Sequence, residues 1–148
     1  MFLPKPMRTA NYYGYGPYES YIDKHQASYL GAFCADIEAL HEDYTRPQEN
    51  GSHYHCEYVR IADAHASLTV YNETPFSFNL SEYTQEELEH KAHNYELEKA
   101  DATVLCIDYR QSGIGSGSCG PQLAHEYRLN DYHYHYSFHI KPEVLQTV

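Results

Sequence analysis

Apolar and polar side chains alternate along much of the chain, and this period of two predicts strands. The alternation is almost strict over 126–140, where tyrosine, phenylalanine and isoleucine take turns with histidine and serine. It is also clear over 75–81, where Phe76, Phe78 and Leu80 fall on one face. The pattern over 126–140 predicts one face in the core and one wetter face. Less regular patterns predict strands over 12–21, 52–62, 67–72 and 102–110, and a strand with an irregular end over 28–40.

Turn-forming residues separate these strands, and one short helix interrupts them. The "PQENG" segment at 47–51 has the Pro, Asn and Gly of a turn, and the glycine-rich segment at 112–122 predicts a long loop. Thr84 is a good N-cap with Glu87 as its capping-box partner, which predicts a helix over 84–93. Short strands with a single helix predict one all-β domain over 1–148, an antiparallel β-sandwich.

Composition narrows the classes of function. At 148 residues the chain is long enough for one domain with its own core. Acidic residues outnumber basic ones 21 to 10, and the net charge of −11 disfavours nucleic acid and anionic membrane as partners because both would repel the protein. The four cysteines lack CxxC spacing and the N-terminus lacks an apolar signal-peptide core, so we expect reduced thiols in a cytoplasmic protein. No apolar run is long enough to cross a bilayer.

A group of potential metal ligands lies in the strand predicted over 52–62. On a regular strand His53 and His55 share one face and Cys56 lies on the other, so only two ligands converge. A zinc site needs three or four ligands. A second group of histidines shares a face of the last predicted strand: His133, His135 and His139. A polar strand face rich in histidine and tyrosine is the simpler interpretation of both groups.

Three other kinds of chemistry have weak support in the sequence. "GIGSGSCG" at 113–120 has the letters of a phosphate-binding loop, but it opens no helix and lacks the lysine of a P-loop. Cys119 with His125 as its base is a conceivable nucleophile, although such pairs arise by coincidence. No two carboxyl groups stand out as a glycosidase pair. The 17 tyrosines suit sheet faces and sugar stacking equally well.

Several motifs together resemble a known family. The chain is similar, from Tyr12 to about Ile140, to the C-terminal domain of the large bacterial β-galactosidases of glycoside hydrolase family 2. The similar segments, in order, are "YYGYGPYESYIDK", "RPQENGSHY", "PFSFNLSEYTQEEL", "YELE", "IDYRQSGIGSGSCGP" and "EYRL". The resemblance implies an antiparallel β super-sandwich, galactose mutarotase-like, with one short helix near 84–93. In some bacteria this domain is a separate small subunit.

The resemblance also implies where the chemistry lies. In the family the catalytic glutamates, together with magnesium and sodium, belong to a TIM barrel that this chain does not contain, so we expect no catalytic residue and no metal site here, His53 and His55 included. One binding role transfers, because the glycine-rich loop presents a tryptophan to the sugar in the family. Cys119, preceded by Ser118, stands at that position. We therefore expect these two residues to bind substrate, with a smaller contact surface than tryptophan.

The implied partners follow from the family. The chain resembles only the second part of the family's domain, so unpaired sheet edges are expected, and such edges associate with a catalytic barrel domain, a large subunit or a second copy. The function implied is hydrolysis, with retention, of terminal non-reducing β-D-galactose residues by the complete enzyme, the fragment alone being inactive. The alternative is a stand-alone carbohydrate-binding or structural module of the same fold. A small mutarotase-like epimerase would need a His and a carboxylate in one pocket, which no spacing here indicates.

Overall fold

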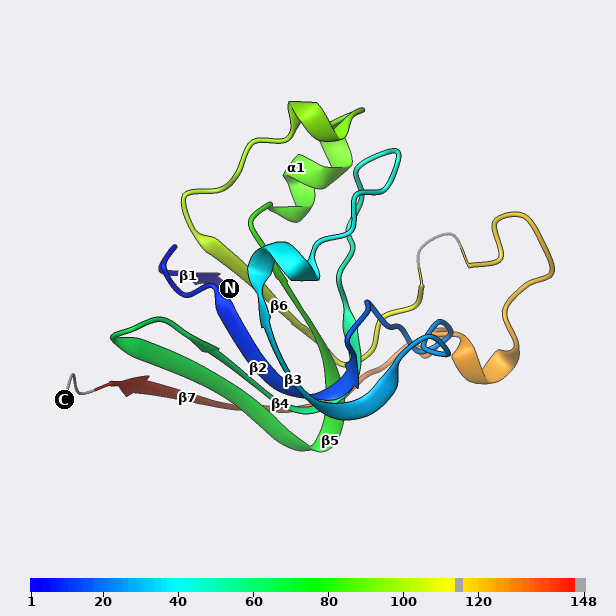
Figure 1. Ribbon diagram of the computed structural model, residues 1–148. Coiled ribbons are helices and arrows are strands. Elements are labelled where there is room, and N and C mark those ends of the chain that lie inside the picture. The colour runs from blue at the N-terminus through cyan, green and yellow to red at the C-terminus, as the bar shows by residue number, and fades with distance from the viewer. Residues whose placement is uncertain (114–115, 146–148) are drawn as a thin grey trace.

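The computed structural model describes residues 1–113 and 116–145, and in these residues seven strands form one antiparallel sheet (Figure 1). The strand order is β1-β6-β5-β4-β2-β3, and β7 pairs with β5 outside this path. The strands are β1 (Phe2–Leu3), β2 (Thr9–Gly16), β3 (Tyr29–Asp36), β4 (His53–Ala62), β5 (Ala66–Ser81), β6 (Thr103–Asp108) and β7 (His139–Val144). The all-β, antiparallel prediction is confirmed, and the sheet is consistent with a β-sandwich.

Strand β5 is the centre of the sheet and changes its neighbour halfway along. Its first part, Ala66–Tyr71, pairs with β7 on one side and β4 on the other. Its second part, Ser77–Ser81, pairs with β6. The sequence pattern predicts two strands, over 67–72 and 75–81, and the structure joins them into one bent strand that turns the sheet around the core (Figure 1).

The core lies on one face of this bent sheet. Alternate residues of β2, β4, β5 and β6 point into it, because successive side chains of a strand face opposite ways. The predicted alternation of Phe76, Phe78 and Leu80 is confirmed, since all three are buried there. The other residues of the main cluster are Met7, Ala10, Tyr12, Ile37, Leu40, Cys56, Val59, Ile61, Val70 and Leu105.

One α-helix and three 3₁₀ turns complete the described structure. Helix α1 (Gln85–His90) begins where predicted, because the Thr84 hydroxyl accepts the Glu87 backbone N–H at 3.1 Å. It ends three residues earlier than predicted, and the Glu87 carboxylate accepts the backbone N–H of Glu98 instead of closing a capping box. The 3₁₀ turns are η1 (Ile37–Leu40), η2 (Asn94–Glu96) and η3 (His125–Tyr127). No helix in the described part is long and apolar enough to cross a membrane.

The strand predicted over 126–140 is wrong for most of its length. Only its last two residues belong to a strand, β7, and residues 128–138 form neither helix nor strand. Most of the face expected in the core is exposed, Tyr132 by 98%, and of its side chains Phe138 packs partly buried against the core. Alternation predicts a strand only where a neighbouring strand satisfies the backbone N–H and C=O groups. Of residues 126–140, only His139 and Ile140 pair with a neighbouring strand, which is β5.

Candidate functional site

The glycine-rich loop, residues 112–122, leaves the sheet after β6 and extends away from it (Figure 1). Residues 114–115 lie outside the described structure. Both predicted substrate-binding side chains, Ser118 and Cys119, are exposed, and the Ser118 hydroxyl lies 4.0 Å from the Cys119 sulfur. Gly117 has a φ of +76°, a conformation that side chains disfavour. The loop thus presents the two predicted residues to the outside, and their contact with sugar stays a prediction.

Asp23 supports the base of this loop. One carboxylate oxygen accepts the backbone N–H of Gly113 at 2.5 Å, and the other accepts the hydroxyl of Ser116. Beside it, the backbone N–H of Ile22 donates to the carbonyl of Gln111 at 3.2 Å. These contacts join the loop to the segment that follows β2, 90 residues earlier in the chain. The loop is therefore anchored at its start although its tip is exposed.

Glu19 fixes the same segment to the "PQENG" turn. Its carboxylate is buried and accepts hydrogen bonds from Lys24 at 2.6 Å, Tyr21 at 3.0 Å, the Gly51 backbone at 3.0 Å, and the Tyr44 hydroxyl. Burial alone would raise the pKa of Glu19, but these donors outweigh it and hold the pKa below its ordinary value. Glu19 is thus a fully occupied anion, which supports the fold and is not free to act on a substrate.

The histidines of β4 do not form the predicted pair. His55 has a φ of +58°, and the pairing of β4 with β5 shifts register on both sides of Cys56, so the regular alternation is lost there. His53 is buried against Tyr12 and Phe78, with ring centroids 4.7 and 5.2 Å away, and burial lowers its pKa to about 4.

His55 instead lies half-buried among other rings. Its ring contacts those of Tyr15 and Tyr54, which also contact the ring of His25. The prediction that His53 and His55 share a face is therefore wrong. Across residues 1–113 and 116–145, no group of three or more His, Cys, Asp or Glu side chains is placed to hold a metal ion.

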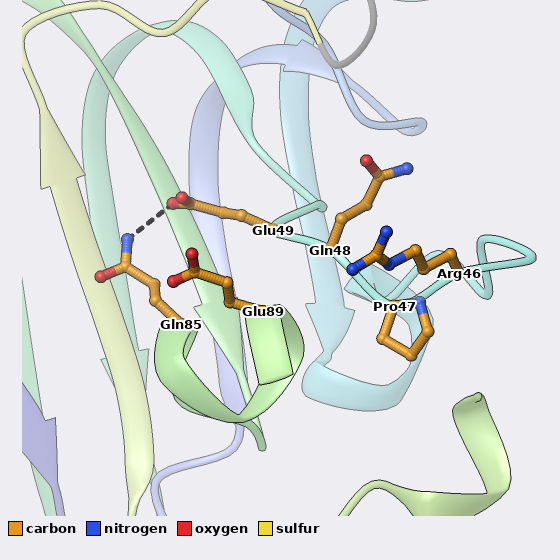
Figure 2. A pocket seen from close by; sticks show the side chains of 6 residues that line it. All are labelled: Arg46, Pro47, Gln48, Glu49, Gln85 and Glu89. Atoms are coloured by element: carbon orange, nitrogen blue, oxygen red, sulfur yellow. Dashed lines mark hydrogen bonds between the residues drawn. The ribbon is translucent and has the colours of Figure 1, made fainter. Parts of the chain in front are cut away.

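A surface recess of about 390 Å³ lies between the "PQENG" turn and helix α1 (Figure 2). Gln85 of the helix donates to the Glu49 carboxylate of the turn at 2.8 Å, which fastens the two together. Glu89 points into the same space, and the remaining lining residues are Arg46, Pro47 and Gln48. The glycine-rich loop does not line this recess, so the predicted substrate-binding residues lie elsewhere.

A buried polar layer lies behind the core, on the opposite face of β5 and β6. Ser77, Asn79 and Asp108 share this face by register, and each has a buried oxygen without a hydrogen-bond partner. Burial, with a smaller contribution from Glu49, raises the pKa of Asp108 to about 6. Ionisation of Asp108 is therefore less favourable in the folded chain than in water.

The sequence contains Glu19 and Asp23 within the motif "GYGPYESYID", but sequence reasoning alone assigned neither a role. Their partners, Gly51 and Gly113, lie 32 and 90 residues away along the chain. No local periodicity reports such distant contacts. The available signal was the proximity of two acidic residues to glycines and a proline, which indicates a turn and does not indicate what the turn binds.

Comparisons with known proteins give consistent results. The model of the family described as "Beta galactosidase small chain" matches residues 1–140. A β-galactosidase of Actinobacillus pleuropneumoniae is 53% identical over 128 residues, covering 86% of this chain and 12% of the relative. A β-galactosidase of Staphylococcus xylosus is 45% identical over 139 residues, covering 94% of this chain and 14% of the relative. The chain therefore spans only a small part of the length of these relatives.

Proposed function

The chain belongs to the β-galactosidase small-chain family, and from this premise we propose that it is the C-terminal sandwich region of an enzyme that hydrolyses terminal β-D-galactosides. The main support is the extent of the two alignments, because most of this chain matches only about an eighth of each relative. Such an alignment is typical of one component of a larger enzyme. The chain is therefore a component of a β-galactosidase. The substrate, the retaining mechanism and the catalytic partner belong to the proposal.

The catalytic groups are proposed to lie outside this chain, in a barrel domain or large subunit. A retaining glycosidase needs two carboxyl groups about 5 Å apart on either side of the scissile bond. The buried Glu19 is occupied by its donors, and Asp108 lies behind the sheet. We assign the magnesium and sodium ions to the same barrel domain or large subunit. The isolated chain should therefore be inactive.

The chain's own contribution is proposed to be the glycine-rich loop. Its tip is exposed and can reach a second domain, while its base is held to the rest of this chain by Asp23. Ser118 and Cys119 would then form part of the wall of the galactose site. A cysteine offers less surface than an aromatic ring, so this wall would make a small contact with the sugar.

Strand β3 is proposed to contact the remaining part of the enzyme or a second copy of the chain. It is one of the two end strands of the sheet, and its side chains Tyr29 and Leu30 are exposed. An exposed, eight-residue edge with unpaired backbone groups is a template for strand addition. Pairing there would cover this edge in the assembled enzyme.

A hybrid enzyme tests the proposal. The segment of the Actinobacillus pleuropneumoniae β-galactosidase that matches this chain is removed, and the matching 128 residues of this chain replace it. We expect the truncated relative to lose hydrolysis of a chromogenic β-galactoside and the hybrid to regain it. A hybrid whose loop is replaced by glycine and serine of equal length is the control for the loop. A soluble hybrid of the correct mass without activity would contradict the proposal.

A stand-alone carbohydrate-binding module is the second candidate function, and one observation favours it. A pocket of about 560 Å³ lies beside the bend of β5 and is lined by both aromatic and polar side chains, among them Tyr109, Tyr136, His135 and His139. Stacked rings with hydrogen-bonding neighbours suit sugars. Titration calorimetry of the isolated chain with galactose and lactose decides between the two candidates, because the enzyme component should show no heat of binding.

A further inference from the structure

We propose that Asp23 is the positioning residue of the glycine-rich loop, holding its base so that Ser118 and Cys119 are presented in one place. The inference rests on the proposed function of the loop as part of the galactose site. The observation behind it is the two-pronged contact of one carboxylate with the loop, through the Gly113 backbone N–H at 2.5 Å and the Ser116 hydroxyl.

A carboxylate suits this position because it only accepts hydrogen bonds and offers an oxygen to each donor. The loop is built to approach it closely. A Cβ atom on Gly113 would lie 3.1 Å from one Asp23 oxygen and 3.3 Å from the other. A larger residue there would push the carboxylate away from the backbone N–H that it accepts. Gly113 and Asp23 therefore depend on each other, since the hydrogen bond between them requires a residue without a side chain at position 113.

Asp23 is itself held firmly. Tyr21 and Lys24 exchange two backbone hydrogen bonds around it, at 2.8 and 3.2 Å, which closes a tight turn. Ile22 is buried, and its N–H donates to the carbonyl of Gln111. Glu19 accepts hydrogen bonds from Tyr21 and Lys24 of the same turn and from the Gly51 backbone ahead of β4. The fold thus fixes the position of Asp23, and the hydrogen bonds to Asp23 in turn fix the start of the loop.

At its other end the loop has a weaker anchor. The Arg128 side chain donates to the backbone carbonyl of Leu123 at 2.6 Å, in an exposed segment without sheet pairing. Between the two anchors, Gly117, Ser118, Cys119 and Gly120 are all exposed. Loss of the Asp23 side chain removes both of the hydrogen bonds that it accepts from the start of the loop, and should therefore let the described tip move.

The first test uses the chain alone. Asp23→Ala should raise the amide exchange rate of Gly113 by about tenfold to a hundredfold, as for the loss of a hydrogen bond to a charged group. Asp23→Asn should raise it less, and Ser116→Ala should raise it least, since the Gly113 contact remains. Asp101→Ala, at an exposed aspartate, is the matched control and should change nothing.

A nitroxide on Cys119, in a Cys34→Ser background because Cys34 is also exposed, should gain mobility in the same order of variants. If Asp23→Ala does not fold, Asp23→Asn and Ser116→Ala carry the test. Unchanged Gly113 exchange and unchanged nitroxide mobility in folded Asp23→Asn and Ser116→Ala would overturn the proposal.

The second test uses the hybrid enzyme. Asp23→Asn should raise KM severalfold with little change in kcat, because a displaced loop weakens binding of substrate and transition state alike. A merely destabilised hybrid would lose active enzyme, lowering kcat at constant KM. If Gly113 exchange responds but KM does not, the anchoring role of Asp23 stands and the loop's role in the sugar site is wrong. An inactive unmodified hybrid would instead contradict the proposed function itself.

Discussion

Glu19 and Asp23 lie four residues apart on one segment and carry the same functional group, yet they serve different regions. Glu19 is buried and accepts four hydrogen bonds that hold the "PQENG" turn. Asp23 is partly exposed and accepts two from the glycine-rich loop. A buried carboxylate with many donors is costly to disturb, whereas an exposed one can be lost with little harm to the fold. One segment thus stabilises the sheet and positions a loop.

The largest expected effect is at Glu19. Glu19→Gln should lower the free energy of unfolding by about 3 kcal/mol, because it leaves Lys24 without its anion and turns an NH₂ group toward buried donors. Urea denaturation at pH 7 measures the loss, with Glu57→Gln at an exposed position as the control.

The pH dependence sharpens this prediction. The folded pKa of Glu19 lies below its unfolded value, so its stabilisation is present above the unfolded pKa and is lost as pH falls through the folded one. The difference between the parent chain and Glu19→Gln should therefore shrink in acid. A difference that is constant from pH 7 to pH 3 would show that Glu19 is not held as an anion.

Gly51 is the next most sensitive position in the Glu19 region. It has a φ of +72°, and a Cβ atom there would lie 2.2 Å from the carbonyl oxygen of Leu40. Gly51→Ala should lower the free energy of unfolding by roughly 2 kcal/mol. Gly120→Ala, in the loop, meets nothing within 4 Å and should cost less than about 0.5 kcal/mol. Equal costs at the two glycines in thermal melts would remove the contrast between the regions.

Asp108 offers a carboxyl group with the opposite behaviour. Its folded pKa is raised to about 6, so the folded state favours the protonated form and becomes less stable as pH rises through 6. Asp108→Asn should stabilise the chain by about 1–2 kcal/mol at pH 7.5, allowing for solvent screening. Urea titrations should show this gain fading by pH 4, and a gain of equal size at both pH values would contradict the assigned ionisation.

The smallest expected effect on stability is in the glycine-rich loop. Ser118→Ala and Cys119→Ser alter exposed side chains and should change the free energy of unfolding by less than about 0.5 kcal/mol. In the hybrid enzyme Cys119→Trp should nonetheless change KM, because an aromatic ring adds a surface for the sugar. Substitutions in the loop that unfold the isolated chain would show that the loop is part of the fold.

Local sequence patterns predicted the features that depend on neighbouring residues alone. The alternation of Phe76, Phe78 and Leu80 and the cap at Thr84 led to the correct strand face and helix start. They failed where distant residues decide. The strand predicted over 126–140 lacks a neighbour for most of its length, and the His53–His55 pair is broken by a positive φ at His55.

The candidate site was predicted from motifs, and its supports were not. Ser118 and Cys119 came from the resemblance of one loop to a family. Asp23 came only from the folded chain, because its partner lies 90 residues away. Pairing partners at such a separation depend on the whole sheet, which no short window of sequence contains.

The reactivity of Cys119 tests most directly whether the loop lies at the galactose site. In a Cys34→Ser background Cys119 is the exposed thiol, since Cys56 is buried and Cys106 partly buried. Burial also raises the pKa of Cys106 to about 11 and that of Cys56 further, which makes both less reactive. A thiol reagent should modify Cys119 quickly in the isolated chain. In the hybrid enzyme, a non-hydrolysable thiogalactoside at ten times its Kd should slow the reaction by about tenfold. Equal rates with and without the thiogalactoside, in an active hybrid, would show that Cys119 lies away from the sugar.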